Sequence, residues 1–237
     1  MLLAPLTESR SRHLDAYLDG AARELFAHDE RLRGLDLRVE FRGGVAHLAG
    51  AVDDPGRLRT ARDLIGRLDG VFAVWDRVRV AGREPVAIDI GCGGTKQYPG
   101  NIGVDLRQAD GVDVVADLRA GLPFPDASAD RVFAVHILEH LVDFLPLVDE
   151  CHRVLRPGGI LHVLSPWWRF VNAVADPTHV RLLDVQTMKG ICERADTDRR
   201  WHPLHAGCDG ASVFADLMRV DADAPAPSRE HLARFFD

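Results

Sequence analysis

The sequence predicts an open parallel α/β sheet preceded by a smaller α+β unit, and three short apolar runs carry the first half of this prediction. These runs have the length of strands and cover residues 86–90, 102–104 and 112–116. Glycines or carboxylates that suit contact with a ligand follow them: Gly91, Gly93 and Gly94 after the first, Asp105 after the second and Asp117 after the third. Because ligands bind at the carboxyl ends of the strands in such sheets, these residues predict a binding site.

The first 82 residues predict a helix, a hairpin, a second helix and a third strand. Apolar residues three or four positions apart indicate one helical face over 12–28, capped by Ser11. Alternation over 37–41 and 44–52 predicts two strands, joined at Gly43-Gly44 by a two-residue turn. A second helix starts at Pro55, a residue tolerated in a first turn, and ends at Gly70 before a strand over 71–80. Residues 81–85 form a short linker, which divides the chain into domains 1–82 and 83–237.

The second domain continues with alternating strands and helices. A strand over 131–135 precedes a helix over 145–155, which the Pro-Gly-Gly at 157–159 stops. The next strand covers 160–165, a helix follows over 184–194, and 211–220 forms an edge strand or a strand pair. Residues 221–227 have the composition of a surface segment, and 231–236 predict a final helical turn.

The glycine-rich turn and Asp105 favour a nucleoside as ligand. Glycine lets the backbone approach a ligand closely, because no Cβ intervenes. The spacing is neither the dinucleotide pattern G-x-G-x-x-G nor a P-loop. Asp105 follows Gly94 by 11 residues, where its carboxylate can accept hydrogen bonds from two ribose hydroxyls. The same charge repels phosphate, so a nucleoside is favoured over a nucleotide.

These residues resemble the class I S-adenosylmethionine-dependent methyltransferases, over about residues 85–185. Residues 89–93 (Asp-Ile-Gly-Cys-Gly) match the first motif of that family, and 122–130, 136–140 and 153–159 match later segments. The resemblance implies a Rossmann-like sheet and S-adenosylmethionine as cofactor, with Asp105 at ribose and Asp117-Leu118 at adenine. The implied cofactor-binding residues are Asp89, Gly91, Cys92, Gly93, Asp105, Leu106, Asp117, Leu118 and His136. One departure is that only residues 95–101 separate the glycine turn from the second strand, too few for the usual helix.

The N-terminal domain resembles the BON domain over about residues 12–82. The spacing from Gly44 to Val52 and the Gly70-Val71 junction carry the likeness. The resemblance implies binding to a lipid or protein surface, while the pattern is equally that of a module for docking or dimerisation.

Three groups of residues are candidates for acceptor binding or catalysis. His136, Glu139 and His140 follow the fourth strand, and their spacing places them on one face of a helix. Residues 176–179 (Asp-Pro-Thr-His) predict a turn that holds His179 above the sheet. In some methyltransferases a similar segment lines the acceptor pocket. Trp167 and Trp168 either wall that pocket or pack in the core. Glu139, His140 and His179 are the catalytic candidates; His140 more often caps or packs in such a position, and His179 could equally serve as a hydrogen-bonding group.

No metal site is predicted. His202, His205 and Cys208, with Cys192 upstream, have suitable chemistry, but their spacing matches no common zinc framework, and Pro203 and Gly207 suggest a surface loop. Cys92 lies within the glycine turn, where we expect no nucleophilic role.

Composition restricts the class of protein. The net charge of −7 and the lack of a lysine- or arginine-rich block disfavour nucleic acid as the main partner. Four scattered cysteines, no signal-peptide pattern and no apolar run of membrane-spanning length predict a cytoplasmic bacterial protein. The favoured function is methyl transfer by direct displacement to a small-molecule or peptide acceptor. The alternative is a non-catalytic nucleoside-binding or scaffold protein whose BON-like domain recruits a lipid or protein partner, and a homodimer is a further possibility.

Overall fold

The computed structural model describes residues 8–236 and divides the chain into two compact units, Met1–Pro85 and Val86–Asp237. Each unit has its own cluster of buried apolar side chains. The division lies three residues beyond the boundary expected from the sequence (85 − 82 = 3). Among the described residues, no helix combines the length and apolar character needed to cross a membrane.

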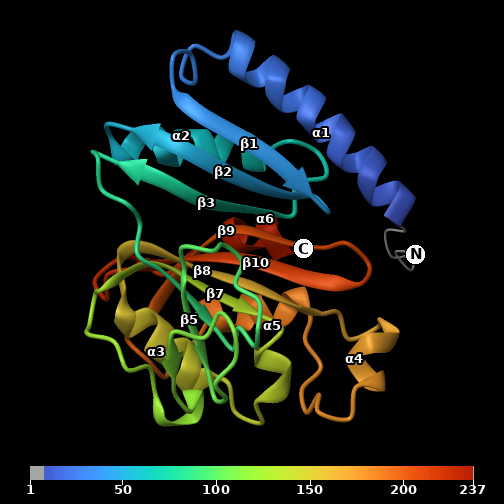
Figure 1. Ribbon diagram of the computed structural model, residues 1–237, viewed down its shortest axis with the longest axis vertical. Coiled ribbons are helices and arrows are strands. Elements are labelled where there is room, and N and C mark those ends of the chain that lie inside the picture. Colours follow the sequence, from blue (N-terminus) through green and yellow to red (C-terminus); the bar gives the residue numbers. More distant parts are fainter. Residues whose placement is uncertain (1–7, 237) are drawn as a thin grey trace. The chain divides into compact units, whose positions relative to one another are not determined.

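The N-terminal unit is an α+β layer structure, as the sequence predicted (Figure 1). Its elements are α1 (Glu8–His28), β1 (Asp36–Arg42), β2 (Val45–Val52), α2 (Pro55–Gly66) and β3 (Ala73–Val80). β1 and β2 form an antiparallel hairpin, and β3 pairs with β2 in parallel after the crossover through α2. α2 ends at Gly66 rather than at the predicted Gly70, because Arg67 already serves as its C-cap.

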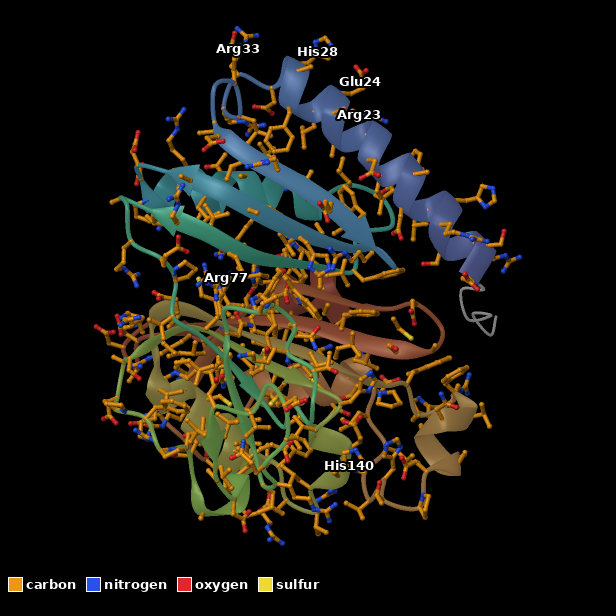
Figure 2. The ribbon with its side chains drawn as sticks, in the orientation of Figure 1. Arg23, Glu24, His28, Arg33, Arg77 and His140 are labelled. Atoms are coloured by element: carbon orange, nitrogen blue, oxygen red, sulfur yellow. The ribbon has the colours of Figure 1, made fainter. Side chains whose placement is uncertain are left out.

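Local chemistry explains the hairpin and the start of the second helix. Gly43 and Gly44 have φ angles of 60° and 77°, the left-handed pair that a two-residue hairpin turn requires. Asp15 of α1 accepts the N–H groups of both glycines over 2.9 Å, which fastens the helix to the turn. Asp54 caps α2 by accepting the Gly56 N–H over 2.8 Å. The opposite face of α1 is solvated, and Figure 2 shows Arg23, Glu24 and His28 along it.

The C-terminal unit contains one seven-stranded sheet with helices and turns around it (Figure 1). Its strands are β4 (Ala87–Ile90), β5 (Ile102–Asp105), β6 (Val114–Val115), β7 (Ala129–Val135), β8 (Leu155–Pro166), β9 (Arg200–Cys208) and β10 (Ser212–Val220). Its helices and 3₁₀ turns are η1 (Leu118–Ala120), η2 (Leu138–His140), α3 (Leu145–Val154), α4 (Val171–Ala175), α5 (Val185–Cys192) and α6 (Arg229–Phe236).

The strand order is β6-β5-β4-β7-β8-β10-β9, with β4 to β8 mutually parallel and β10 antiparallel to both neighbours. The order reverses between β5 and β7, on either side of β4, and the carboxyl ends of these strands form the ligand-binding edge expected at such a switch point. This arrangement confirms the predicted α/β fold with a small N-terminal α+β unit.

Several predicted boundaries are wrong in detail. α3 ends at Val154, before the Pro-Gly-Gly, because Leu155 already pairs with Ala129 in the sheet. The third strand shrinks to Val114–Val115. β10 is an inner strand, not an edge strand, since β9 covers its outer side. Residues 200–208, expected as a surface loop, form β9, where Pro203 is tolerated because β9 is the edge of the sheet.

Candidate active site

A tight turn after β4 forms the first part of the site. Gly91 has a φ of 66°, and a Cβ at this position would lie 2.6 Å from the Ile137 side chain. Gly93 has a φ of 55°, and a Cβ there would meet nothing within 4 Å. Both positions therefore require the left-handed backbone that glycine adopts most readily. Gly91 lies against the turn that follows β7, while Gly93 exposes its backbone to open space.

Asp105, the last residue of β5, fixes this turn through its carboxylate. Oδ2 accepts the Gly93 N–H over 2.8 Å, and Oδ1 accepts the Arg107 N–H over 3.1 Å. The side chain remains partly exposed, and each carboxylate oxygen can accept a further hydrogen bond. Leu106 follows with 55% of its surface exposed. At this strand end, two backbone hydrogen bonds orient the Asp105 carboxylate, which can accept hydrogen bonds from two adjacent hydroxyl groups. The exposed Leu106 side chain lies next to it.

Asp89 is buried within β4 and shapes the short connection to β5. Its Oδ2 accepts the Gln97 N–H over 2.7 Å and the Asn101 side-chain amide over 3.2 Å. Residues 91–101 contain only turns and bends, so the expected absence of a helix here is confirmed. A buried carboxylate accepting two hydrogen bonds therefore organises the segment in place of helical hydrogen bonding.

Asp117 and Leu118 lie at the end of the third parallel strand. Asp117 caps η1, accepting the Arg119 N–H over 3.0 Å, and its carboxylate also contacts the Arg119 guanidinium at 2.7 Å. The Arg119 guanidinium lowers the pKa of Asp117 to about 2. Leu118 is buried, so of this pair only Asp117 presents its side chain to solvent.

Cys92 lies in the glycine turn with its thiol partly buried. Burial, together with the nearby carboxylates of Asp105 and Asp89, raises the pKa of this thiol. A thiol with a raised pKa is a poor nucleophile because little thiolate forms at neutral pH. This environment agrees with the expectation that Cys92 has no nucleophilic role.

The turn after β7 carries three of the predicted residues, but not on an α-helix. His136 has a φ of 53°, and η2 covers only Leu138–His140, so the predicted helical face does not exist. The turn instead places the His136 Nδ1 3.2 Å from Oε1 of Glu139. Glu139 is 1% exposed, and its Oε2 accepts the Ser165 hydroxyl over 3.1 Å. Ser165, at the end of β8, was not predicted as a site residue.

Residues 176–179 form the predicted turn. Oδ1 of Asp176 accepts the Thr178 N–H over 2.8 Å and its hydroxyl over 2.6 Å, and these bonds lower the pKa of Asp176. The turn places the rings of His140 and His179 4.8 Å apart. The Glu139 carbonyl also accepts the N–H groups of Val180 and Arg181, over 2.9 and 3.1 Å. The structure therefore brings together two segments that lie about 40 positions apart in the sequence, as Figure 2 shows around the labelled His140.

A cavity of about 590 Å³ lies between these two segments. It is lined by His136, His140, Pro166, Asn172, Ala175, Asp176, Pro177 and His179. Pockets for small molecules commonly occupy about 300–1,000 Å³. Asn172 and Ala175 belong to α4, which was not predicted, because a helix of only five residues leaves no clear periodic pattern.

Trp167 and Trp168 directly follow Pro166, which lines the cavity, but neither tryptophan lines it. The Trp167 indole N–H donates to Oδ2 of Asp184, the N-cap of α5, over 2.8 Å, and its ring packs against the core. Trp168 is 42% exposed, and the Arg169 guanidinium lies 4.6 Å from its ring centroid. A role for Trp168 in acceptor binding remains a prediction.

The four residues first considered as zinc ligands are not brought together. Cys192 is buried in the core, the His202 ring contacts that of His231, His205 bonds to Asp216, and Cys208 accepts the Gly210 N–H. Within residues 8–236, the one group of three side chains placed to hold a metal ion is Glu139, His140 and His179.

Comparison with known proteins follows the two units. Residues 88–163 match the methyltransferase domain family, and residues 15–82 match the BON domain family. A probable S-adenosylmethionine-dependent methyltransferase of Mycolicibacterium smegmatis is 34% identical over 179 residues, covering 62% of this chain and 68% of that protein. A similarly described protein of Mycobacterium tuberculosis is 29% identical over 183 residues, covering 71% of this chain and 64% of its own.

Among solved structures, a methyltransferase from Aquifex aeolicus covers 57% of this chain and 82% of its own, with 16% identity and a TM-score of 0.45. The sequence comparisons and the strand order define the class: the chain belongs to the S-adenosylmethionine-dependent methyltransferases. Its cofactor is S-adenosylmethionine, and a BON domain precedes the catalytic fold. The chain spans about two thirds of the length of the two relatives.

Proposed function

We propose that this protein methylates a small-molecule or peptide acceptor bound in the cavity between the turn after β7 and the loop after α4. The observation that carries the proposal is the position of this cavity. Gly91 of the glycine turn lies against Ile137, and the adjacent His136 lines the cavity. One turn of chain thus borders both the cofactor side and the acceptor side. The alternative, a non-catalytic scaffold, is not favoured because the chain belongs to a family of enzymes.

The residues on the cofactor side fit the nucleoside part of S-adenosylmethionine. Asp105 offers two acceptor oxygens to the ribose hydroxyls, and the side chains of Leu106 and Asp117 would face the base, with Leu118 contributing its backbone because its side chain is buried. Gly93 leaves open space for close approach of the ligand. Asp89 stabilises the segment that follows the turn by accepting the Gln97 N–H. When bound, this cofactor supplies a methyl group activated by a sulfonium. The protein then has to hold the acceptor atom in line with that methyl group.

On the acceptor side, three histidines, His136, His140 and His179, line the cavity. His140 and His179 place ring nitrogen atoms near the acceptor. Such a nitrogen can act as the general base when the acceptor has to lose a proton on methylation. Glu139 lies behind them and fixes the turn. The cavity volume favours a small molecule, or one side chain of a peptide, over an extended macromolecular surface.

We further propose the organisation of the whole chain. The domain boundary lies after residue 82, the protein is bacterial and acts in the cytoplasm, and the BON domain serves for docking to a protein partner or for dimerisation. The bacterial relatives support the bacterial origin.

Calorimetric titration with S-adenosylmethionine and S-adenosylhomocysteine tests the cofactor side. Asp105→Ala removes two hydrogen bonds to a charged acceptor, each worth about 1.5–3 kcal/mol, so we expect binding weaker by about 10²- to 10⁴-fold. Asp110→Ala, an exposed carboxylate nearby, is the matched control and should bind like wild type. An Asp105→Ala affinity within twofold of wild type would refute the assignment.

The acceptor side is tested separately. His179→Ala should lower the rate of S-adenosylhomocysteine formation with an active acceptor by at least about tenfold. Its affinity for S-adenosylhomocysteine should stay within twofold of wild type, because His179 lies on the acceptor side. An unchanged rate would contradict the role of His179.

A further inference from the structure

The group formed by Glu139, His140 and His179 has the composition of a metal site. Each residue offers one ligand atom, and these atoms lie within 4.8 Å of one another. Metal-bound imidazole nitrogens and carboxylate oxygens lie about 2.0–2.2 Å from the ion, so ligand atoms end about 3–3.5 Å apart in a tetrahedral site. Small side-chain rotations would close the remaining gap. This group differs from the sequence-based expectation of no metal.

In each of the two imidazoles, one ring nitrogen contacts a backbone carbonyl. Nδ1 of His140 lies 3.2 Å from the Thr178 carbonyl oxygen, and Nδ1 of His179 lies 3.3 Å from that of Ala173. A carbonyl only accepts, so the Nδ1 atoms face these carbonyls and the Nε2 atoms point to other partners, that of His179 lying 3.7 Å from Oδ2 of Asp176. The Thr178 hydroxyl lies 3.1 Å from the same His140 nitrogen and donates its hydrogen bond to Asp176. Histidines that bind metals almost always donate their other N–H in this way.

The third ligand is the buried carboxylate of Glu139, whose orientation is set by its neighbours. The Glu139 side chain is 2% exposed, and Ser165 and His136 each contact one of its oxygens. Its backbone carbonyl binds two N–H groups of the segment that carries His179. The elements that supply the three ligands are therefore fastened to one another before any ion binds. A carboxylate and two imidazoles are ligand types that transition-metal ions bind.

We propose that Glu139, His140 and His179 bind a divalent transition-metal ion whose open coordination positions face the cavity. Two imidazoles and one carboxylate suit zinc, iron, cobalt, nickel or manganese rather than calcium, which prefers oxygen ligands only. The use of the ion rests on the proposed function. An acceptor hydroxyl bound to the ion would have a lowered pKa and would lose its proton to water; its oxygen would then bond to the methyl carbon as the methyl–sulfur bond breaks and S-adenosylhomocysteine leaves. The imidazoles would then act as ligands, and the ion would take the place of the general base assigned to them under the proposed function.

The test is a titration of full-length, tag-free protein, stripped with a chelator, with Co²⁺, Zn²⁺ and Mn²⁺. We expect one ion per chain with a dissociation constant of about 10 μM or below for at least one metal, and a visible Co²⁺ spectrum of a low-symmetry nitrogen and oxygen site. Glu139→Gln and His179→Gln should each weaken binding about 10- to 100-fold. His202→Gln, a histidine outside the group, is the matched control and should bind like wild type.

The inference is overturned if no metal binds more tightly than about 1 mM, or if both ligand variants bind as wild type does. The Co²⁺ spectrum of wild-type protein keeps the test valid even if a variant fails to fold. Titration of the same stripped protein with S-adenosylhomocysteine separates the two proposals. A protein that binds S-adenosylhomocysteine but no metal ion overturns this inference alone. A protein that binds a metal ion but not S-adenosylhomocysteine contradicts the proposed function and leaves the metal site standing.

Discussion

Replacement of Asp89 should destabilise the catalytic unit and weaken cofactor binding together. Asp89→Ala removes the acceptor for the Gln97 N–H and for the Asn101 amide. Hydrogen bonds to a charged group contribute about 1.5–3 kcal/mol each, so the expected loss is about 3–6 kcal/mol. For a unit of this size, each kcal/mol lowers Tm by about 2–4 °C, which predicts a fall of about 6–24 °C. Both bonds reach Oδ2, so Asp89→Asn keeps an oxygen that can accept them; it loses only the charge that strengthens them and should cost about half as much.

The assay combines thermal unfolding, amide hydrogen exchange and titration with S-adenosylhomocysteine. Exchange of the Gln97 amide should accelerate more than that of core amides, because its hydrogen bond to Asp89 is lost directly. Asp110→Ala again serves as the control. A Tm within 2 °C of wild type, with unchanged Gln97 exchange and cofactor affinity, would refute the view that Asp89 organises residues 95–101.

Two further predictions concern stability. Burial and the Arg219 charge lower the pKa of His152 to about 4, below its ordinary value of 6.5. The unfolded chain therefore binds this proton first, so the contribution is complete above pH 6.5 and is lost as the pH falls toward 4, by about 2 kcal/mol at pH 5. His152→Gln should remove that pH dependence, as measured by urea unfolding at pH 7 and pH 5; an equal slope in both proteins would contradict the assignment. Deletion of residues 1–82 should leave a folded unit that binds S-adenosylhomocysteine, because Val86–Asp237 has its own core; aggregation of the truncated protein would show that the two units depend on each other for folding.

The parts of the fold that follow from local rules were predictable from the sequence. Gly43-Gly44 gave the hairpin because both residues must have positive φ, and the structure confirms both angles. The glycines after β4 and the carboxylate of Asp105 marked the strand ends for the same kind of reason. The turn at 176–179 followed from Asp-Pro-Thr, whose short polar side chains bond to their own backbone.

The errors arise where tertiary pairing overrides local preference. Pro203 and Gly207 suggested a loop, yet the edge position of β9 tolerates both. The spacing of His136, Glu139 and His140 suggested a helix, but His136 adopts a left-handed backbone and only a 3₁₀ turn follows. The residues of the candidate site were nevertheless named correctly as neighbours. The hydrogen-bond partners of the two imidazoles could not be predicted, because the carbonyls of Thr178 and Ala173 meet them only after folding.

The main-chain bonds between the Glu139 carbonyl and the N–H groups of Val180 and Arg181 have a consequence for how the acceptor side can diversify. Bonds of this kind do not depend on side-chain identity, so they persist when neighbouring residues are exchanged. Residues 171–175 of α4 can therefore vary in size and polarity while the loop stays attached to the sheet. His179 keeps its position during such changes, because the residue that follows it is the one anchored. The backbone bonds at residues 180 and 181 thus hold this loop to the turn after β7 whichever side chains residues 171–175 carry.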